Sequence, residues 1–218
     1  MSPATMEGGT GRHLPISATL LARLRELNGD YLELLCDARA AEVCGGRELP
    51  DEVVQSLARI SPDARRVLAA SPFALFTLRF ADAEFWRHAI QSAAREPATV
   101  RYGFTATPDR PRCAFAAVAL AFAWHVVQSD RMAARLLLGM SDPVGRFLLH
   151  APLSRLERLA GEEAGIVAPR WSGNPRFWPD IMKFAAAQDW PKLVSACALG
   201  RQLTAADFET ALRTSRKD

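Results

Sequence analysis

The two halves of this 218-residue chain carry the same local signals in the same order. Each half has a long apolar stretch, a short segment opening at aspartate, another opening at proline, an irregular aromatic stretch and then a Phe-Trp pair. Residues 49–69 and 140–160 align with identities at Asp51/Asp142, Val53/Val144, Leu57/Leu148, Leu68/Leu159 and Ala69/Ala160. One inserted residue later, Phe85-Trp86 meets Phe177-Trp178. The pattern predicts an internal duplication into two helical units. Two unrelated helical segments in a chain rich in alanine and leucine are the alternative.

Composition favours helices over a sheet. The chain contains 38 Ala and 24 Arg but only 2 Tyr, and alanine, leucine and arginine are the better helix formers. We therefore predict an all-α fold in which the two similar units pack side by side as a pseudo-dimer.

Proline and glycine divide the chain into predicted regions. The segment from Glu96 to Arg112 has the composition of a linker, so the domain boundary is placed there. We expect a disordered lead over 1–16, a first unit over 17–95, a linker over 96–112, a second unit over 113–188 and a C-terminal helical hairpin over 189–218. Helix starts are predicted at Ser61-Pro62, at Asp82 and at Asn174-Pro175, where capping side chains precede apolar residues.

The first long helix carries a narrow apolar seam. Apolar residues recur in steps of four and three at Leu20, Leu24, Leu27, Tyr31, Leu34, Ala38 and Ala41, before Gly45 and Gly46. Charged residues occupy the rest of the helix, so the seam predicts one main partner helix. In a duplicated chain that partner is the segment from Phe115 to Leu138.

The most apolar stretch, from Cys113 to Val127, is shorter than the roughly 20 residues that cross a bilayer. It predicts a buried helix that continues to Leu138, and no membrane span. The first 15 residues lack the apolar core of a signal peptide, so a cytoplasmic protein is expected.

The cysteines and histidines argue against a metal site or an enzyme. No two of them stand at ligand or triad spacing: Cys36, Cys44, Cys113 and Cys197; His13, His88, His125 and His150. His125 lies in the apolar helix and is expected to be a core residue. Glycine-rich phosphate loops and nucleophile motifs are absent from the sequence. We predict no metal, no cofactor and no enzymatic activity.

Positive charge gathers in the second half of the chain. Residues 1–96 carry 11 basic and 13 acidic side chains, and residues 97–218 carry 16 basic and 11 acidic ones. The segment from Lys192 to Leu212 partly fits a helix-turn-helix, with Gly200 in the turn and Thr204 as the second cap, but a capped hairpin fits better. We predict contacts to the DNA backbone at Arg201, Arg213, Arg216 and Lys217, with a solvated charged end as the alternative.

Short motifs of helix-core residues occur in order in both halves. The first half has Leu27-Asn28, Tyr31-Leu32, Leu35, Leu68-Ala69 and Leu78-Arg79-Phe80, and the second has Asp130, Ala133, Leu138-Gly139-Met140, Leu156 and Leu159-Ala160. Over residues 20–90 and 120–185 the chain resembles FlhD, the small subunit of the bacterial flagellar master activator. The resemblance implies an all-helical, dimerising transcription co-regulator that binds promoter DNA with an FlhC-like partner and weakly alone. The chain is longer than the family pattern, so a tandem fusion would form the pair internally.

A second class of function fits the same features. A non-enzymatic helical adaptor, for example an accessory component of a type III secretion system, would also be helical and free of cofactors. Trp171 lies in a loop rich in glycine and proline and is the tryptophan most expected at a partner surface. Both hypotheses leave a homo-oligomer open.

Overall fold

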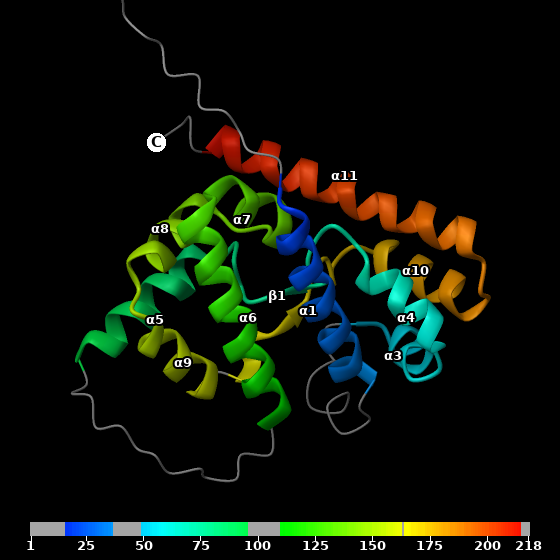
Figure 1. Ribbon diagram of the computed structural model, residues 1–218, viewed down its shortest axis with the longest axis horizontal. Helices are drawn as coiled ribbons and strands as arrows, with labels where there is room; N and C mark the ends of the chain where they lie inside the picture. The colour runs from blue at the N-terminus through cyan, green and yellow to red at the C-terminus, as the bar shows by residue number, and fades with distance from the viewer. Residues whose placement is uncertain (1–15, 37–48, 96–109, 163, 215–218) are drawn as a thin grey trace, which may run out of the picture.

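The structure is a computed structural model that describes residues 16–36, 49–95, 110–162 and 164–214, and this part of the chain is all-α. The only strands in these ranges are β1 (Phe76–Thr77) and β2 (Ala168–Pro169), which pair with each other. The helices labelled in Figure 1 are α1 (Ala18–Cys36), α3 (Asp51–Leu57), α4 (Pro62–Ala69), α5 (Ala83–Arg95), α6 (Arg110–Ser129), α7 (Arg131–Leu138), α8 (Asp142–His150), α9 (Leu153–Glu162), α10 (Phe177–Ala186) and α11 (Trp190–Thr214). A 3-10 turn spans Ala164–Ile166.

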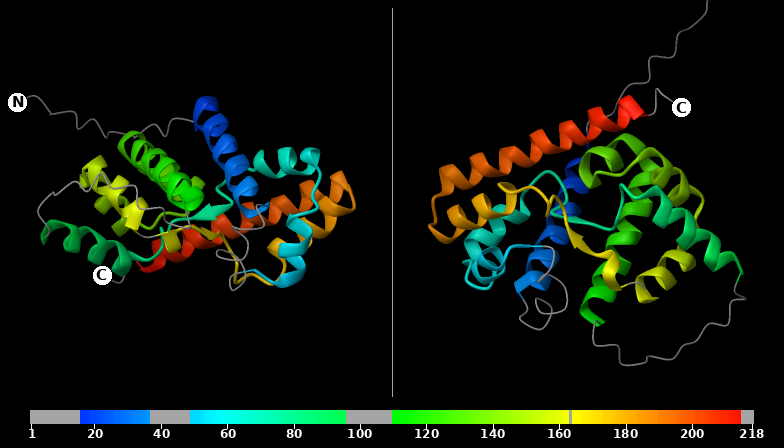
Figure 2. Two further views of the ribbon diagram at one scale, coloured as in Figure 1. Left: turned by 90° about the horizontal axis from the view of Figure 1, so that it is seen from below. Right: turned by 180° about the vertical axis from the view of Figure 1, so that it is seen from behind.

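Helices from the two halves of the sequence are interleaved in space. α5 belongs to the first half but packs on α8 and α9, whereas α10 belongs to the second half and packs on α3. Figure 1 shows two groups of helices on either side of α1, with α11 crossing above them, and Figure 2 gives the same arrangement from below and from behind. The buried apolar side chains form one continuous cluster, so the predicted domain boundary does not separate two cores. Residues 96–109 themselves lie outside the described ranges.

α1 buries a wider face than the predicted seam. Leu24, Leu27, Tyr31 and Leu34 are buried and Leu20 is half-buried. Outside the seam, Asn28, Leu32 and Leu35 are also buried. The prediction of one main partner is wrong, because α3, α4 and α6 all pack on this helix. One of these three helices, α6, contains Phe115 and belongs to the segment predicted to pack on the seam. The ring centroid of Tyr31 lies 5.5 Å from that of Phe115. The rest of the seam and its predicted glycine stop lie outside the described residues.

Asn28 ties α1 to the irregular chain between α4 and β1. Its Nδ2 donates to the Phe73 carbonyl at 2.9 Å and more weakly to those of Ala69 and Ser71, at 3.3 and 3.4 Å. Its Oδ1 accepts the Leu75 N–H at 2.9 Å. A fully buried side chain thus satisfies backbone groups of a segment that forms no helix.

The predicted starts of α4 and α5 are confirmed. Ser61 Oγ accepts the Ala64 N–H at 3.2 Å, and Pro62 occupies the first helical position. Asp82 Oδ1 accepts the Phe85 N–H at 2.9 Å. Both caps satisfy backbone donors that a helix leaves free at its first turn.

The helix predicted from Cys113 to Leu138 is in fact two helices. α6 already begins at Arg110, and Asp130 caps α7 by accepting the N–H groups of Met132 and Ala133 at 2.8 and 3.0 Å. By length and composition α6 could cross a membrane, but half of its apolar window is buried inside the protein. Arg112 near its start is also buried and donates to the Val167 carbonyl.

The C-terminal hairpin and the helix-turn-helix are not formed, because the segment from Lys192 to Leu212 lies inside the continuous helix α11. Thr204 caps nothing; its Oγ1 donates to the Gly200 carbonyl one turn earlier, at 2.8 Å. Gly200 does not end the helix but lets it lie against the buried ring of Phe73. A Cβ at Gly200 would lie 2.2 Å from Phe73 Cζ.

Gly200→Ala is expected to destabilise the protein by about 1–3 kcal/mol, because the added methyl overlaps a buried ring. Helix propensity alone predicts the opposite sign, a gain of about 1 kcal/mol. Gly29→Ala in α1 is the matched control, since nothing lies within 4 Å of a Cβ there, and we expect it to gain about 0.5–1 kcal/mol. Urea unfolding measures both; similar gains at the two positions would contradict the close contact.

Candidate functional site

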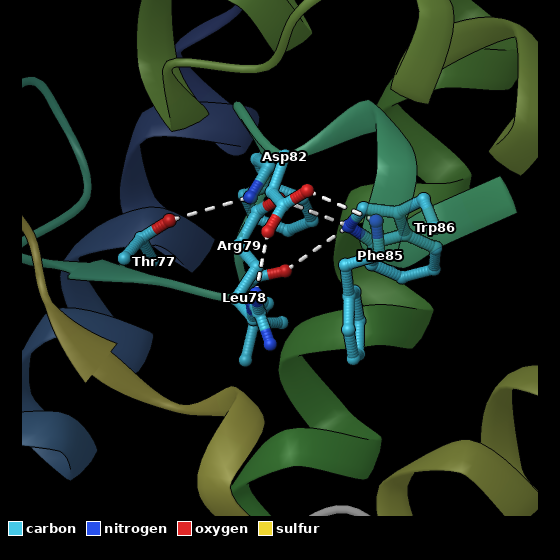
Figure 3. A network of polar contacts seen from close by, with 7 residues as sticks. Thr77, Leu78, Arg79, Asp82, Phe85 and Trp86 are labelled. Carbon is cyan, nitrogen blue, oxygen red and sulfur yellow. Dashed lines mark hydrogen bonds and ion pairs between the residues drawn. The ribbon is translucent and has the colours of Figure 1, made fainter. Parts of the chain in front are cut away.

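The chain before α5 forms a tight aromatic turn, shown in Figure 3. Arg79 has a φ of 54°, in the left-handed region, and its carbonyl accepts the Asp82 N–H at 2.9 Å. The buried Trp86 donates its Nε1–H to the carbonyls of Leu78 and Arg79, both at 3.2 Å. The Arg79 guanidinium pairs with Asp82 and lies 4.3 Å from the centroid of the Phe85 ring. A left-handed non-glycine residue costs about 1–2 kcal/mol, and these contacts hold it in place.

A turn of the same construction precedes α10. Trp171 has a φ of 56°, and its carbonyl accepts the Asn174 N–H at 2.9 Å. Asn174 Oδ1 accepts the Phe177 N–H at 3.0 Å, and Trp178 donates its Nε1–H to the Arg170 carbonyl at 2.7 Å. Each of these residues stands 92 positions after its counterpart in the first turn. The two turns therefore share a left-handed residue, a side-chain oxygen that accepts the N–H three residues later, and a buried tryptophan. The helix start predicted at Asn174-Pro175 falls later, because α10 begins at Phe177 with Arg176 as its N-cap.

β1 and β2, which lead into the two turns, pair with each other in an antiparallel register. Phe76 is opposite Pro169 and Thr77 is opposite Ala168. At a spacing of 92 positions, Ala168 corresponds to Phe76 and Pro169 corresponds to Thr77. Phe76 therefore faces the counterpart of Thr77, and Thr77 faces the counterpart of Phe76. A two-fold axis between identical strands produces this relation. The helices are exchanged in the same way. α8 corresponds to α3 and α10 corresponds to α5 by their order in the two halves, and α3 packs on α10 while α8 packs on α5.

The first turn holds a titratable carboxylate, Asp82, where the second holds the amide of Asn174. The Phe85 N–H bond and then the Arg79 side chain hold the pKa of Asp82 below its ordinary 3.8. The folded pKa is depressed, so the charge stabilises the fold above about pH 4, and this stabilisation is lost as the pH falls through the folded pKa. Asp82→Asn should lower stability at pH 7, with a difference from wild type that shrinks as the pH falls below about 4 and the folded carboxyl becomes protonated. Thermal melts from pH 7 to pH 2 measure it, and Asn174→Ala should show no such pH dependence.

Trp171 is less exposed than its loop predicted. Its side chain is half-buried, with its ring centroid 4.9 Å from that of Phe177, and its Nε1 donates to Asp207 Oδ2 at 3.0 Å. Trp171 takes this position because it occupies the left-handed place of the turn.

Arg170 connects this turn to α7 and α11. It is buried, donates from Nη1 to the Leu137 carbonyl at 3.1 Å, and forms an ion pair with Asp207 at 3.5 Å. Burial lowers the pKa of this guanidinium to about 10, against the opposing attraction of Asp207. Gly139 leaves the room for it, because a Cβ there would lie 2.5 Å from Arg170 Nη2.

A groove of about 530 Å³ lies between α1, α4 and α11, and we name it the arginine groove. Its charged walls are Arg25 from α1, Asp63 and Arg66 from α4, and Arg201 from α11. Arg66 is paired with Asp63, so the groove keeps an excess of positive charge. The α11 residues that line it recur at helical spacing, at Val194, Cys197, Ala198 and Arg201. Val194 is 60 % exposed, and burial raises the pKa of the Cys197 thiol.

Of the four predicted DNA-binding residues, only Arg201 has a side chain that the structure describes. Arg201 is exposed and lines the arginine groove. Arg213 stands twelve residues later on α11, about 18 Å along the helix axis. Arg216 and Lys217 lie outside the described residues. The sequence pattern therefore indicates one groove residue, Arg201, but not Arg25 or Arg66, because no local motif links three separate helices.

The described histidines are all exposed, including His125, which was expected in the core. On α6 the neighbours Phe122, Ala123, Val126 and Val127 take the inward face instead. Among the described residues, no three His, Cys, Asp or Glu side chains gather into a metal site.

Comparisons with models of protein families, with curated proteins and with solved structures find no match to this chain. Function is therefore inferred from the residues and geometry described above.

Proposed function

We propose that this chain is a cytoplasmic, FlhD-like transcription co-regulator in which two FlhD-like units in one chain form the pair internally. The observation that carries the proposal is the recurrence of the aromatic turn. The two turns have a left-handed residue, an N–H-accepting side chain and a buried tryptophan at corresponding positions, and their strands face each other in the register of a two-fold pair. A duplicated unit that dimerises accounts for this arrangement, and the resemblance to a dimerising family agrees with it.

The proposed regulator acts through a partner rather than by reading bases itself. The second half carries a net charge of only +5 by its basic and acidic residues, and the helix-turn-helix that would have entered a groove is not formed. Such a chain binds DNA weakly and without sequence choice. An FlhC-like protein then supplies the sequence specificity.

DNA titrations at several salt concentrations test the proposal. We expect weak, salt-dependent binding of the chain alone to a promoter duplex, and tighter, sequence-selective binding after an FlhC-like protein from the same genome is added. Replacing Arg201, Arg213, Arg216 and Lys217 by alanine should lower the salt slope by about 0.9 for each phosphate that is no longer neutralised. Arg201→Ala alone separates the groove from the C-terminal end. Unchanged slopes in both variants, with no effect of the partner, would overturn the regulatory proposal.

A non-enzymatic adaptor, such as an accessory component of a type III secretion system, is the second candidate. The arginine groove favours it, because an exposed valine between arginines suits a protein surface better than a nucleic acid. A pull-down from the native cell with identification by mass spectrometry distinguishes the two candidates. Secretion-apparatus proteins would support the adaptor, and an FlhC-like protein would support the co-regulator.

A further inference from the structure

We propose that two copies of this chain associate through the arginine groove, with the acidic face of α1 from each copy lying in the groove of the other. The proposal does not rest on the regulatory function, although Arg201 also belongs to the proposed DNA contacts, and no residue that lines the groove belongs to β1 or β2. Two complementary surfaces of the same chain carry it.

The groove offers positive charge that the described residues leave unpaired. Arg25 and Arg201 are exposed and form no ion pair with any residue in the described ranges. Only Arg66 has a carboxylate partner, Asp63. Apolar surface lies between these side chains, including Val194. The groove therefore fits a surface that brings both carboxylates and apolar contact.

α1 presents the complementary charge on its outer face. Glu26, Asp30 and Glu33 recur at spacings of four and three, all three are exposed, and none is paired with a cation of the described chain. Burial, and then the like charges of Glu33 and Glu26, raise the pKa of Asp30. Gly29 on the same side has nothing within 4 Å of where a Cβ would be, which leaves room for another surface to approach.

One helix carries parts of both surfaces, which favours a symmetric pair. α1 contributes Arg25 to the wall of the groove and also bears the acidic face. A two-fold dimer can then form both contacts at once, with the same residues used twice. Exposed ion pairs contribute little singly, so we expect a weak dimer that dissociates as salt rises.

Sedimentation equilibrium of the full chain tests this proposal. Wild type should self-associate at low salt and become monomeric at high salt. Arg25→Glu with Arg201→Glu should weaken association at least about tenfold, and Glu26→Arg with Asp30→Arg should do the same, because like charges then meet. An equimolar mixture of the two variants should recover wild-type association within about threefold, since each then meets opposite charge on the other.

Two controls exclude effects of net charge and of misfolding on the association of these variants. Arg59→Glu with Arg146→Glu makes the same change in net charge at exposed positions outside the groove, and it should leave association unchanged; far-ultraviolet circular dichroism checks that each variant is folded. A wild type that stays monomeric at low salt, a mixture that does not recover, or an equal effect of the control variant would each overturn the proposal.

Thiol labelling gives a second measurement without any variant. Cys197 lines the groove and Cys113 does not. At low salt, the rate at which a maleimide labels Cys197 should fall as the protein concentration rises, while the rate at Cys113 stays constant. Rates at Cys197 that do not depend on protein concentration would count against the dimer.

Discussion

The Asn28→Ala variant is expected to lose about 2–6 kcal/mol of stability. Asn28 is fully buried, and alanine would leave the Phe73 carbonyl and the Leu75 N–H without their partners at 2.9 Å. Each buried backbone group left unsatisfied costs about 1–3 kcal/mol. The longer bonds to Ala69 and Ser71 add less. Because a domain has only about 5–15 kcal/mol of stability in total, the loss takes a large share of it.

Chemical denaturation followed by circular dichroism measures this loss. Gln128→Ala is the control, because the exposed Gln128 amide also donates to a carbonyl, that of Leu149, at 2.9 Å. We expect that variant to stay within about 0.5 kcal/mol of wild type, as surface substitutions usually do. A loss below about 1 kcal/mol for Asn28→Ala would show that water replaces the missing amide. The polar contacts of Asn28 would then not hold the segment before β1.

Features decided within one helical turn could be predicted from the sequence. The caps at Ser61 and Asp82 form as expected, because a capping oxygen needs only the backbone N–H groups of the next few residues. The helical class follows from composition in the same local way. Local spacing likewise places Gly200 in a turn between two helices, but a distant ring decides its role. The sequence does not show that Phe73 lies there.

The candidate site depends on contacts between distant segments, so little of it could be predicted. Arg201 enters the arginine groove only because α11 stays continuous and lies beside α1 and α4. Trp171 was assigned to the surface from the composition of its loop. Trp171 stands 92 positions after Arg79, and the same number of positions separates the two Phe-Trp pairs. This equal spacing along the sequence indicates that Trp171 and Arg79 occupy the same place in their turns.

Leu27→Ala is the second large effect, with an expected loss of about 2–5 kcal/mol. Leu27 is only 5 % exposed, on the face of α1 that α3, α4 and α6 cover. The loss combines the transfer of the removed methyl groups to water with the cavity they leave, which surrounding helices fill only in part. Three covering neighbours make collapse of that cavity difficult, which favours the upper part of the range.

Leu20→Ala tests whether the loss of stability follows the burial of the leucine or only its position on the seam. Leu20 belongs to the same stripe but is half-buried near the start of α1, so its loss should be about 1 kcal/mol. Urea unfolding of the two variants, with unchanged dependence on denaturant, measures the difference. Equal losses would mean that helix formation rather than packing is being measured. A loss below about 0.5 kcal/mol for Leu27→Ala would mean that the stripe is exposed in the isolated protein and is covered only by a partner.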